Sequence, residues 1–343
     1  MSDVRPSGNE RDGAAELLAS ARARVSAAAA DLALPQGMRL SEWQRITLRG
    51  LLAQLVRSVE DALRAEIAQA PVSEALRAAL SSAHVEIAMP VLAGTGALAE
   101  PALIDLLLRR AEEHRLHRAA ASDNALLVEL AGDADEGVAG AAMALLIAQN
   151  GRVDGFREPV LPRSDLPAEV EHHLVWSVAA ALRRYMIVQH RAEPAACDAA
   201  LGAAAGRLLA GHDEGEGAEA RAMRLALAVQ AVGRGEDDAL LGQALTEGSL
   251  AFFLALIGLR TGLEPGAVWE ILTARSGPVL LLRAAGVARR DAAAILLGLG
   301  TDENELGAAL DRFDGMTDAA APALLGLWTV DSGYRDAVAR LAQ

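Results

Sequence analysis

Residues 41–69 read SEWQRITLRGLLAQLVRSVEDALRAEIAQ, and this stretch predicts the fold class. Ser41 and Gln44 have the spacing of a capping box, in which both side chains accept hydrogen bonds from free backbone N–H groups at a helix start. Apolar residues then recur at every third or fourth position, at Leu48, Leu51, Leu52, Leu55, Val59, Leu63 and Ile67. That period marks one face of a helix, so we expect a long amphipathic helix from Ser41 to Gln69.

A second long helix is predicted from about Pro167 to His190. Its apolar face comprises Val170, Leu174, Val178, Leu182 and Tyr185. The segment LVWSVAAALR at 174–183 echoes LVRSVEDALR at 55–64, and seven of the ten paired positions are identical. A true duplication and a chance match in a chain rich in Ala and Leu both stay open.

The rest of the chain shows short apolar segments divided by small and polar residues. Such breaks occur at 94–96, 122–124, 132–135, 150–151, 164–167, 233–235, 262–265, 276–278 and 300–302. No sustained alternation of apolar and polar residues indicates a strand, and residues 153–161, with two prolines at or beside their end, are interpreted as a loop. We therefore expect an all-α fold of antiparallel helical hairpins stacked into a HEAT-like array, with two longer helices of the bundle type.

Three regions are predicted along the chain. Residues 1–40 form a flexible N-terminal segment with a short helix at about 14–31, and residues 41–210 form a helical-repeat domain. Residues 218–343 form a C-terminal helical domain. The acidic, Gly-rich stretch GHDEGEG at 211–217 cannot bury apolar surface, so it is interpreted as an exposed loop at the domain boundary.

The amino-acid composition argues against several classes of function. The chain of 343 residues has a formal charge of −14, with 52% hydrophobic and 3% aromatic residues. It contains no lysine, which excludes a P-loop lysine, a Schiff base and a lysine general base. The acidic balance argues against nucleic acid as the principal partner, because phosphate backbones require a basic face.

The single cysteine, Cys197, indicates a reducing, cytoplasmic location and excludes an intramolecular disulfide. No segment is long enough for a membrane span, since the apolar runs at 137–149 and 250–259 are too short. The N-terminal residues MSDVRPSGNERDG lack the apolar core of a secretory signal.

Several motifs carry a resemblance to a known family. They are VEIAMPVL at 85–92, LID at 103–105, His114, DLP at 165–167, LR at 182–183 and EGSLAFF at 247–253. In this order they resemble the bacterial family called domain of unknown function 2336, over about residues 40–299. The resemblance implies an all-helical repeat fold and no established activity, so no functional residue is carried over. Similar proteins often carry His-Asp-Val-Glu where this chain has Arg57-Ser58-Val59-Glu60.

Histidines are the main pool of ligands for a metal. His114 and His117 lie one helical turn apart, which suits two ligands, but Arg109, Arg110, Arg115 and Arg118 surround them. A structural or surface role is therefore favoured. Glu169 and His172 form one Glu-x-x-His half-site, and no second half-site exists to complete a di-iron centre.

Other motifs also have plainer interpretations. The segments Asp133–Gly137 and Asp302–Asn304 mimic the start of a calcium loop but lack its later ligands, so we expect helix N-caps. Cys197 is interpreted as a small core residue rather than a nucleophile. No catalytic, cofactor-binding or metal-binding residue is assigned, and no cofactor is expected.

The sequence therefore favours a non-enzymatic protein-interaction or regulatory scaffold with an unidentified protein partner. The alternative is a signalling protein related to the dimerisation bundles of histidine kinases. It would lack the phosphoacceptor histidine, because Arg57 occupies that position.

The apolar stripe of the first long helix is a candidate interface. Its residues are Leu48, Leu51, Leu52, Leu55, Val59 and Leu63. An exposed stripe of this kind is commonly buried in a two-fold homodimer, which we predict here. The rival prediction is that the helix at 167–190 covers the stripe within one chain.

Overall fold

The computed structural model describes residues 39–70, 77–78, 80, 86–119, 124–247, 249–274, 276–317 and 320–341. Within these ranges the chain forms helices and loops and no strand, apart from one isolated bridge between Val153 and Pro159. The all-α prediction is confirmed for them, whereas HEAT-like stacking stays a prediction. The short helix predicted at 14–31 lies outside the described residues. The chain divides into two compact units, Met1–Ile46 and Thr47–Gln343.

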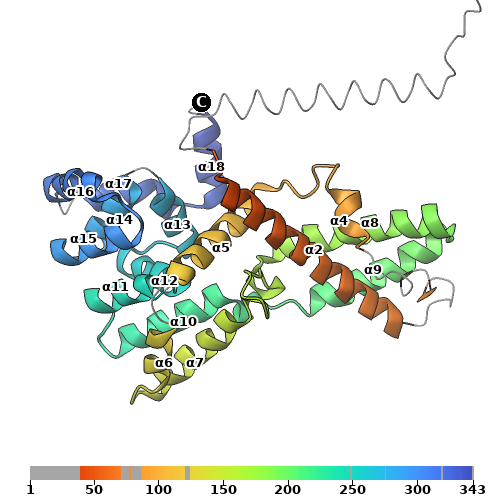
Figure 1. Cartoon of the computed structure of the whole chain (residues 1–343), viewed down its shortest axis with the longest axis horizontal. Coiled ribbons are helices and arrows are strands. Elements are labelled where there is room, and N and C mark those ends of the chain that lie inside the picture. The colour runs from red at the N-terminus through yellow and green to blue at the C-terminus, as the bar shows by residue number, and fades with distance from the viewer. Residues whose placement is uncertain are drawn as a thin grey trace, which may run out of the picture. The chain divides into compact units, whose positions relative to one another are not determined.

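The helices are labelled in chain order (Figure 1). Up to residue 216 the elements are α2 (Glu42–Gln69), α4 (Ala88–Leu92), α5 (Pro101–Ala119), α6 (Ala125–Ala131), α7 (Glu136–Asn150), η2 (Arg163–Asp165), α8 (Ala168–His190), α9 (Pro194–Ala210) and η3 (Glu214–Glu216). The later elements are α10 (Ala218–Ala231), α11 (Asp238–Thr246), α12 (Leu250–Thr261), α13 (Pro265–Thr273), α14 (Gly277–Ala284), α15 (Arg289–Gly298), α16 (Glu303–Gly315), α17 (Ala320–Leu325), η4 (Gly326–Thr329) and α18 (Ser332–Leu341).

Both predicted long helices are present as α2 and α8. The capping box at the start of α2 forms as expected. The backbone N–H of Gln44 donates to Ser41 Oγ at 3.2 Å, and the N–H of Ser41 donates to Gln44 Oε1 at 2.9 Å. The repeated segments bury equivalent positions, because Leu55 and Leu174 are both 1% exposed.

The buried apolar side chains form two clusters. The first core draws its residues mainly from α2, α4, α5, α8 and α9. The second core comes from α6, α7 and the helices from α10 onward, and α12 lies inside it with every residue from Leu250 to Gly258 buried. The apolar run at 250–259 is therefore core, apart from Leu259 at its half-buried end.

Helix α5 connects the two cores. Leu103, Leu107 and Ala111 belong to the first core, and Leu116, farther along the same helix, belongs to the second. The pair α6 and α7 precedes α8 in sequence, yet α7 packs on α10 in the second core (Figure 1). The two cores therefore alternate along the sequence, and a domain boundary at 211–217 stays a prediction.

The short elements η2 and η3 cap helices reciprocally: a residue of η2 caps α10, which follows η3, and a residue of η3 caps α8, which follows η2. Asp165 in η2 accepts a hydrogen bond from the N–H of Ala218, which begins α10, at 2.8 Å. Glu214 in η3 accepts one from the N–H of Ala168, which begins α8, at 2.5 Å. The loop at 211–217 is largely exposed, as expected, but its last residue, Gly217, is buried where the two turns meet.

No single helix in the described part of the chain is long and apolar enough to cross a membrane. Helices α12 and α13 meet the length and composition criterion only as a pair, and that pair is bent by 101°.

Candidate functional site

Ionisable residues on α5 are buried where this helix passes from the first core to the second. Arg110, Glu113 and His114 are 5%, 6% and 3% exposed. Charged side chains are rarely buried unless they are paired, so their partners define what this region can do.

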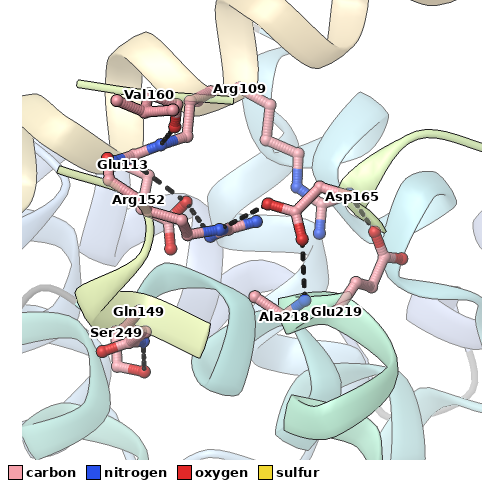
Figure 2. Close-up of polar contacts among 10 residues, drawn as sticks. Arg109, Glu113, Gln149, Arg152, Val160, Asp165, Ala218, Glu219 and Ser249 are labelled. Atoms are coloured by element: carbon pink, nitrogen blue, oxygen red, sulfur yellow. Dashed lines mark hydrogen bonds and ion pairs between the residues drawn. The ribbon is translucent and has the colours of Figure 1, made fainter. Parts of the chain in front are cut away.

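Arg152 follows the C-terminus of α7 and pairs with two carboxylates (Figure 2). Its Nη1 contacts Glu113 Oε2, and its Nε donates to Asp165 Oδ2 at 2.7 Å. Asp165 uses its other oxygen to cap α10 at Ala218. Nearby, Arg109 Nη1 lies 2.8 Å from Glu219 Oε2. One chain of interactions thus connects α5, η2, α10 and the end of α7.

Arg110 fixes the loop that follows α7. Its Nε donates to the carbonyl oxygen of Val160 at 2.8 Å, and its Nη2 donates to that of Arg152. Within the loop, Asp154 Oδ1 accepts hydrogen bonds from the N–H groups of Phe156 at 2.8 Å and Glu158 at 2.9 Å. The loop is therefore an ordered wall of the site.

The buried arginines differ in pKa. Burial lowers the pKa of Arg110 to about 10, an effect that Glu113 partly offsets. Burial alone would also lower the pKa of Arg152, but the carboxylates of Glu113 and Asp165 outweigh it and raise that pKa above its ordinary value. Both guanidinium groups stay charged at neutral pH.

A cleft of about 530 Å³ opens beside these charges. It is lined by His114, His117, Arg118, Asn124, Asn150, Val153, Phe156, Arg157 and Glu158. Two buried polar atoms at its wall, His114 Nδ1 and Asn124 Oδ1, have no hydrogen-bond partner. Buried polar groups are nearly always satisfied, so these two atoms mark an incomplete environment.

The cleft does not favour a cation. Burial, together with the positive charges of Arg110, Arg118 and His117, lowers the pKa of His114 to about 4, so His114 is neutral at neutral pH. Among the described residues, no group of three or more His, Cys, Asp or Glu could hold a metal ion. His114 and His117 line one cleft, as their spacing predicts, but arginines are their charged neighbours.

The other candidates from the sequence have structural contacts. His172 Nε2 accepts a hydrogen bond from Trp176 Nε1 at 3.1 Å. Asp135 caps α7 by accepting the N–H of Val138 at 3.0 Å, and Asp302 caps α16 by accepting that of Asn304 at 2.8 Å, which confirms both predicted N-caps. Cys197 is buried in the first core, and this burial raises the pKa of its thiol.

The candidate interface residues lie in the first core. Leu48, Leu51, Leu55, Val59 and Leu63 are buried within the single chain, and Leu52 is half-buried. They share this core with Leu174 and Val178 of α8. This burial favours the intramolecular alternative, and the homodimer stays an untested prediction.

Sequence reasoning missed several buried acids that cap helices distant in sequence. Glu60, 2% exposed, accepts the N–H of Ile87 at 3.1 Å and that of Ala88 at 2.8 Å at the start of α4. Glu60 lies in the segment 57–60, where this chain departs from similar proteins, and Ile87 and Ala88 lie in the motif at 85–92. These residues are 27 and 28 positions from Glu60, so no local spacing signals the cap.

The chain was compared with known protein families, curated proteins and solved structures. The family model described as "Uncharacterised protein conserved in bacteria (DUF2336)" matches residues 87–324. No curated protein and no solved structure matches the chain.

Proposed function

We propose that this chain, which belongs to the bacterial family DUF2336, is a non-enzymatic protein-interaction or regulatory scaffold, and that α7 carries its docking face. This family membership supplies no activity, so the proposal rests on the exposed surface of the chain itself.

One observation carries the proposal: the outward face of α7 is apolar. From Gly137 to Asn150 the helix contains no charged residue. Its outward row includes Gly140, Met143 and Ile147, and the last two are 47% and 59% exposed. The solvent face of a surface helix is ordinarily polar or charged, and an apolar one is typical of a contact surface.

The inner face of α7 supports this role because it fixes the helix in place. Val138, Ala142 and Leu145 are each 0% exposed in the second core. Asp135 caps the first turn, and Gln149 Nε2 donates to Ser249 Oγ at 2.7 Å in the last (Figure 2). A pre-organised face loses little conformational entropy on binding.

The acidic and basic residues that the sequence offered as candidates for chemistry contact other residues of the chain, which supports a non-enzymatic role. Asp133 pairs with Arg234 at 2.9 Å, and Asp135, Asp302 and His172 have the contacts given above. These contacts support a structural role for the groups, and arrays of short helices in general offer binding surface without special chemistry.

Charge insertion on α7 tests the proposal. The baits for affinity capture from the native bacterium are the wild type, the double variant Met143→Glu with Ile147→Glu, and Val188→Glu as a control at a 62% exposed position on α8. We expect a protein that the wild type and the control retain and the double variant loses, with the complex reconstituted from purified proteins. Identical captures from all three baits would contradict the proposal, provided that their melting temperatures agree.

No observation in the described part of the chain favours the alternative of a signalling protein related to histidine-kinase dimerisation bundles. At the relevant place, Arg57 pairs with Glu86, and Glu60 caps α4 while it pairs with Arg64.

A further inference from the structure

We infer that the cleft between the C-terminal half of α5, Asn124 and the loop after α7 binds a mononucleotide, with the phosphate at its arginine rim and the base against Phe156. This site is independent of the docking face on α7.

The charge of the cleft selects an anion. Arg118 and Arg157 line it together with a single acid, Glu158, while His114 is neutral. Guanidinium groups match the geometry of phosphate oxygens, and a small net positive charge suits one phosphate rather than a polyanion. In a chain with a formal charge of −14, such a cluster is a local exception.

The cleft has room for a ligand larger than a free phosphate. A volume of about 530 Å³ lies within the range of sites for small organic ligands. Phe156 stands at this cleft with 89% of its surface exposed, although it is one of only four phenylalanines in the chain. Asp154 holds the backbone of its loop, so the ring is presented on a fixed support. Exposed aromatic rings of this kind stack on nucleobases.

The side-chain oxygen of Asn124 has no partner because Asn124 does not cap helix α6. It stands at the N-cap of α6, where asparagine ordinarily caps the helix with its own side chain. Here Glu247 accepts the N–H of Leu126 instead, and Asn124 Oδ1 stays buried without a partner. Asn124 also holds a left-handed backbone conformation, with φ of 58°. Such conformations persist where the surroundings enforce them, often at ligand sites.

His114 Nδ1 is the second unpartnered atom. Its imidazole is 3% exposed, and Arg110, which fixes the loop at Val160, lies one turn earlier on α5. Both atoms are buried, so a base reaches them only when the side chains of Asn124 and His114 turn toward the cleft. An amide and a neutral imidazole can then bind the amino and ring-nitrogen edge of a base, which presents both donors and acceptors. A nucleotide bound in this way would satisfy the unpartnered atoms of the two cleft residues, His114 and Asn124.

Calorimetric titration of the full chain tests the assignment. The probes are the monophosphates of adenosine, guanosine, cytidine and uridine, with adenosine, inorganic phosphate and benzoate as comparisons. We expect at least one nucleotide to bind with a Kd below about 1 mM, a value typical of a weak but specific complex. Adenosine and phosphate, each carrying half of the recognition, should bind at least about 10-fold more weakly.

Variants at exposed positions complete the test without risk to the fold. Arg118→Ala should weaken nucleotide binding to the level of the nucleoside, and Phe156→Ala should weaken it about 10-fold through lost stacking. Arg290→Ala, an exposed arginine on α15, is the matched control and should bind as the wild type does. The inference is overturned if no monophosphate binds, if benzoate binds as tightly, or if Arg118→Ala and Arg290→Ala bind alike.

Discussion

At the scale of residues, burial and neighbouring charge decide what each ionisable group does. Arg152 is buried with Glu113 and Asp165, and these carboxylates keep it charged. His114 is buried on the same helix as Glu113, but arginines lie around it and its imidazole is neutral. Burial acts to lower the pKa of both groups, and only at Arg152 do carboxylates outweigh it.

The neutral state of His114 predicts a pH dependence of stability. Its pKa falls from the ordinary 6.5 to about 4 in the folded chain, mainly through burial. Between these values the unfolded chain binds the proton that the folded chain rejects, so His114 makes the free energy of unfolding fall as pH falls from 6.5 toward 4. Urea unfolding at pH 7 and pH 5 should show a smaller fall for His114→Gln than for the wild type. Equal falls would mean that His114 titrates normally.

At the scale of elements, local caps could be predicted from the sequence and distant ones could not. Ser41 with Gln44, and Asp135 with Val138, lie three residues apart, so spacing alone identifies them. Glu247 caps α6 across 121 residues, and a cap of this kind depends on how the helices pack. The candidate site divides in the same way. The helical period places His114 and His117 together, whereas Arg152 reaches Glu113 across 39 residues.

The close approach of η2 and η3 predicts that position 217 must be glycine. A Cβ on Gly217 would lie 2.5 Å from the carbonyl oxygen of Ser164, so the two turns could not approach as they do. We expect Gly217→Ala to destabilise the chain by about 1–3 kcal/mol, as overpacking at a buried site does. Gly206→Ala in α9 is the control, because nothing lies within 4 Å of its added Cβ, and it should be neutral or stabilising. Chemical denaturation measures both, and equal effects would contradict the close approach.

At the scale of the whole unit from Thr47 to Gln343, two apolar cores share one helix and one set of buried charges. Helix α5 contributes to both cores, and the pair α6 and α7 joins the second core although it precedes α8 in the chain. Helix lengths and breaks follow from local apolar patterns. The assignment of α6 and α7 to the later core does not, because it depends on packing between α7 and α10, which are far apart in the sequence.

Removing Arg152 should therefore loosen the connection between the cores. Arg152→Ala leaves Glu113 and Asp165 buried without their shared cation, a loss that typically costs about 3–5 kcal/mol. Because Asp165 also caps α10, the penalty falls on the elements that connect the cores. Hydrogen exchange followed by mass spectrometry should show α5, η2 and the start of α10 exchanging faster, while the centre of α12 stays protected.

A matched control separates this effect from the loss of any arginine. Arg289 pairs with Asp314 at 2.8 Å, but both side chains are about half exposed, so water replaces the pair when it is broken. Arg289→Ala should leave the exchange of α5, η2 and α10 unchanged. If the two variants exchange alike, the buried charges do not connect the cores. If Arg152→Ala exposes α12 as quickly as α5, the two cores unfold as one cooperative body, and α5 rather than the charge network holds them together.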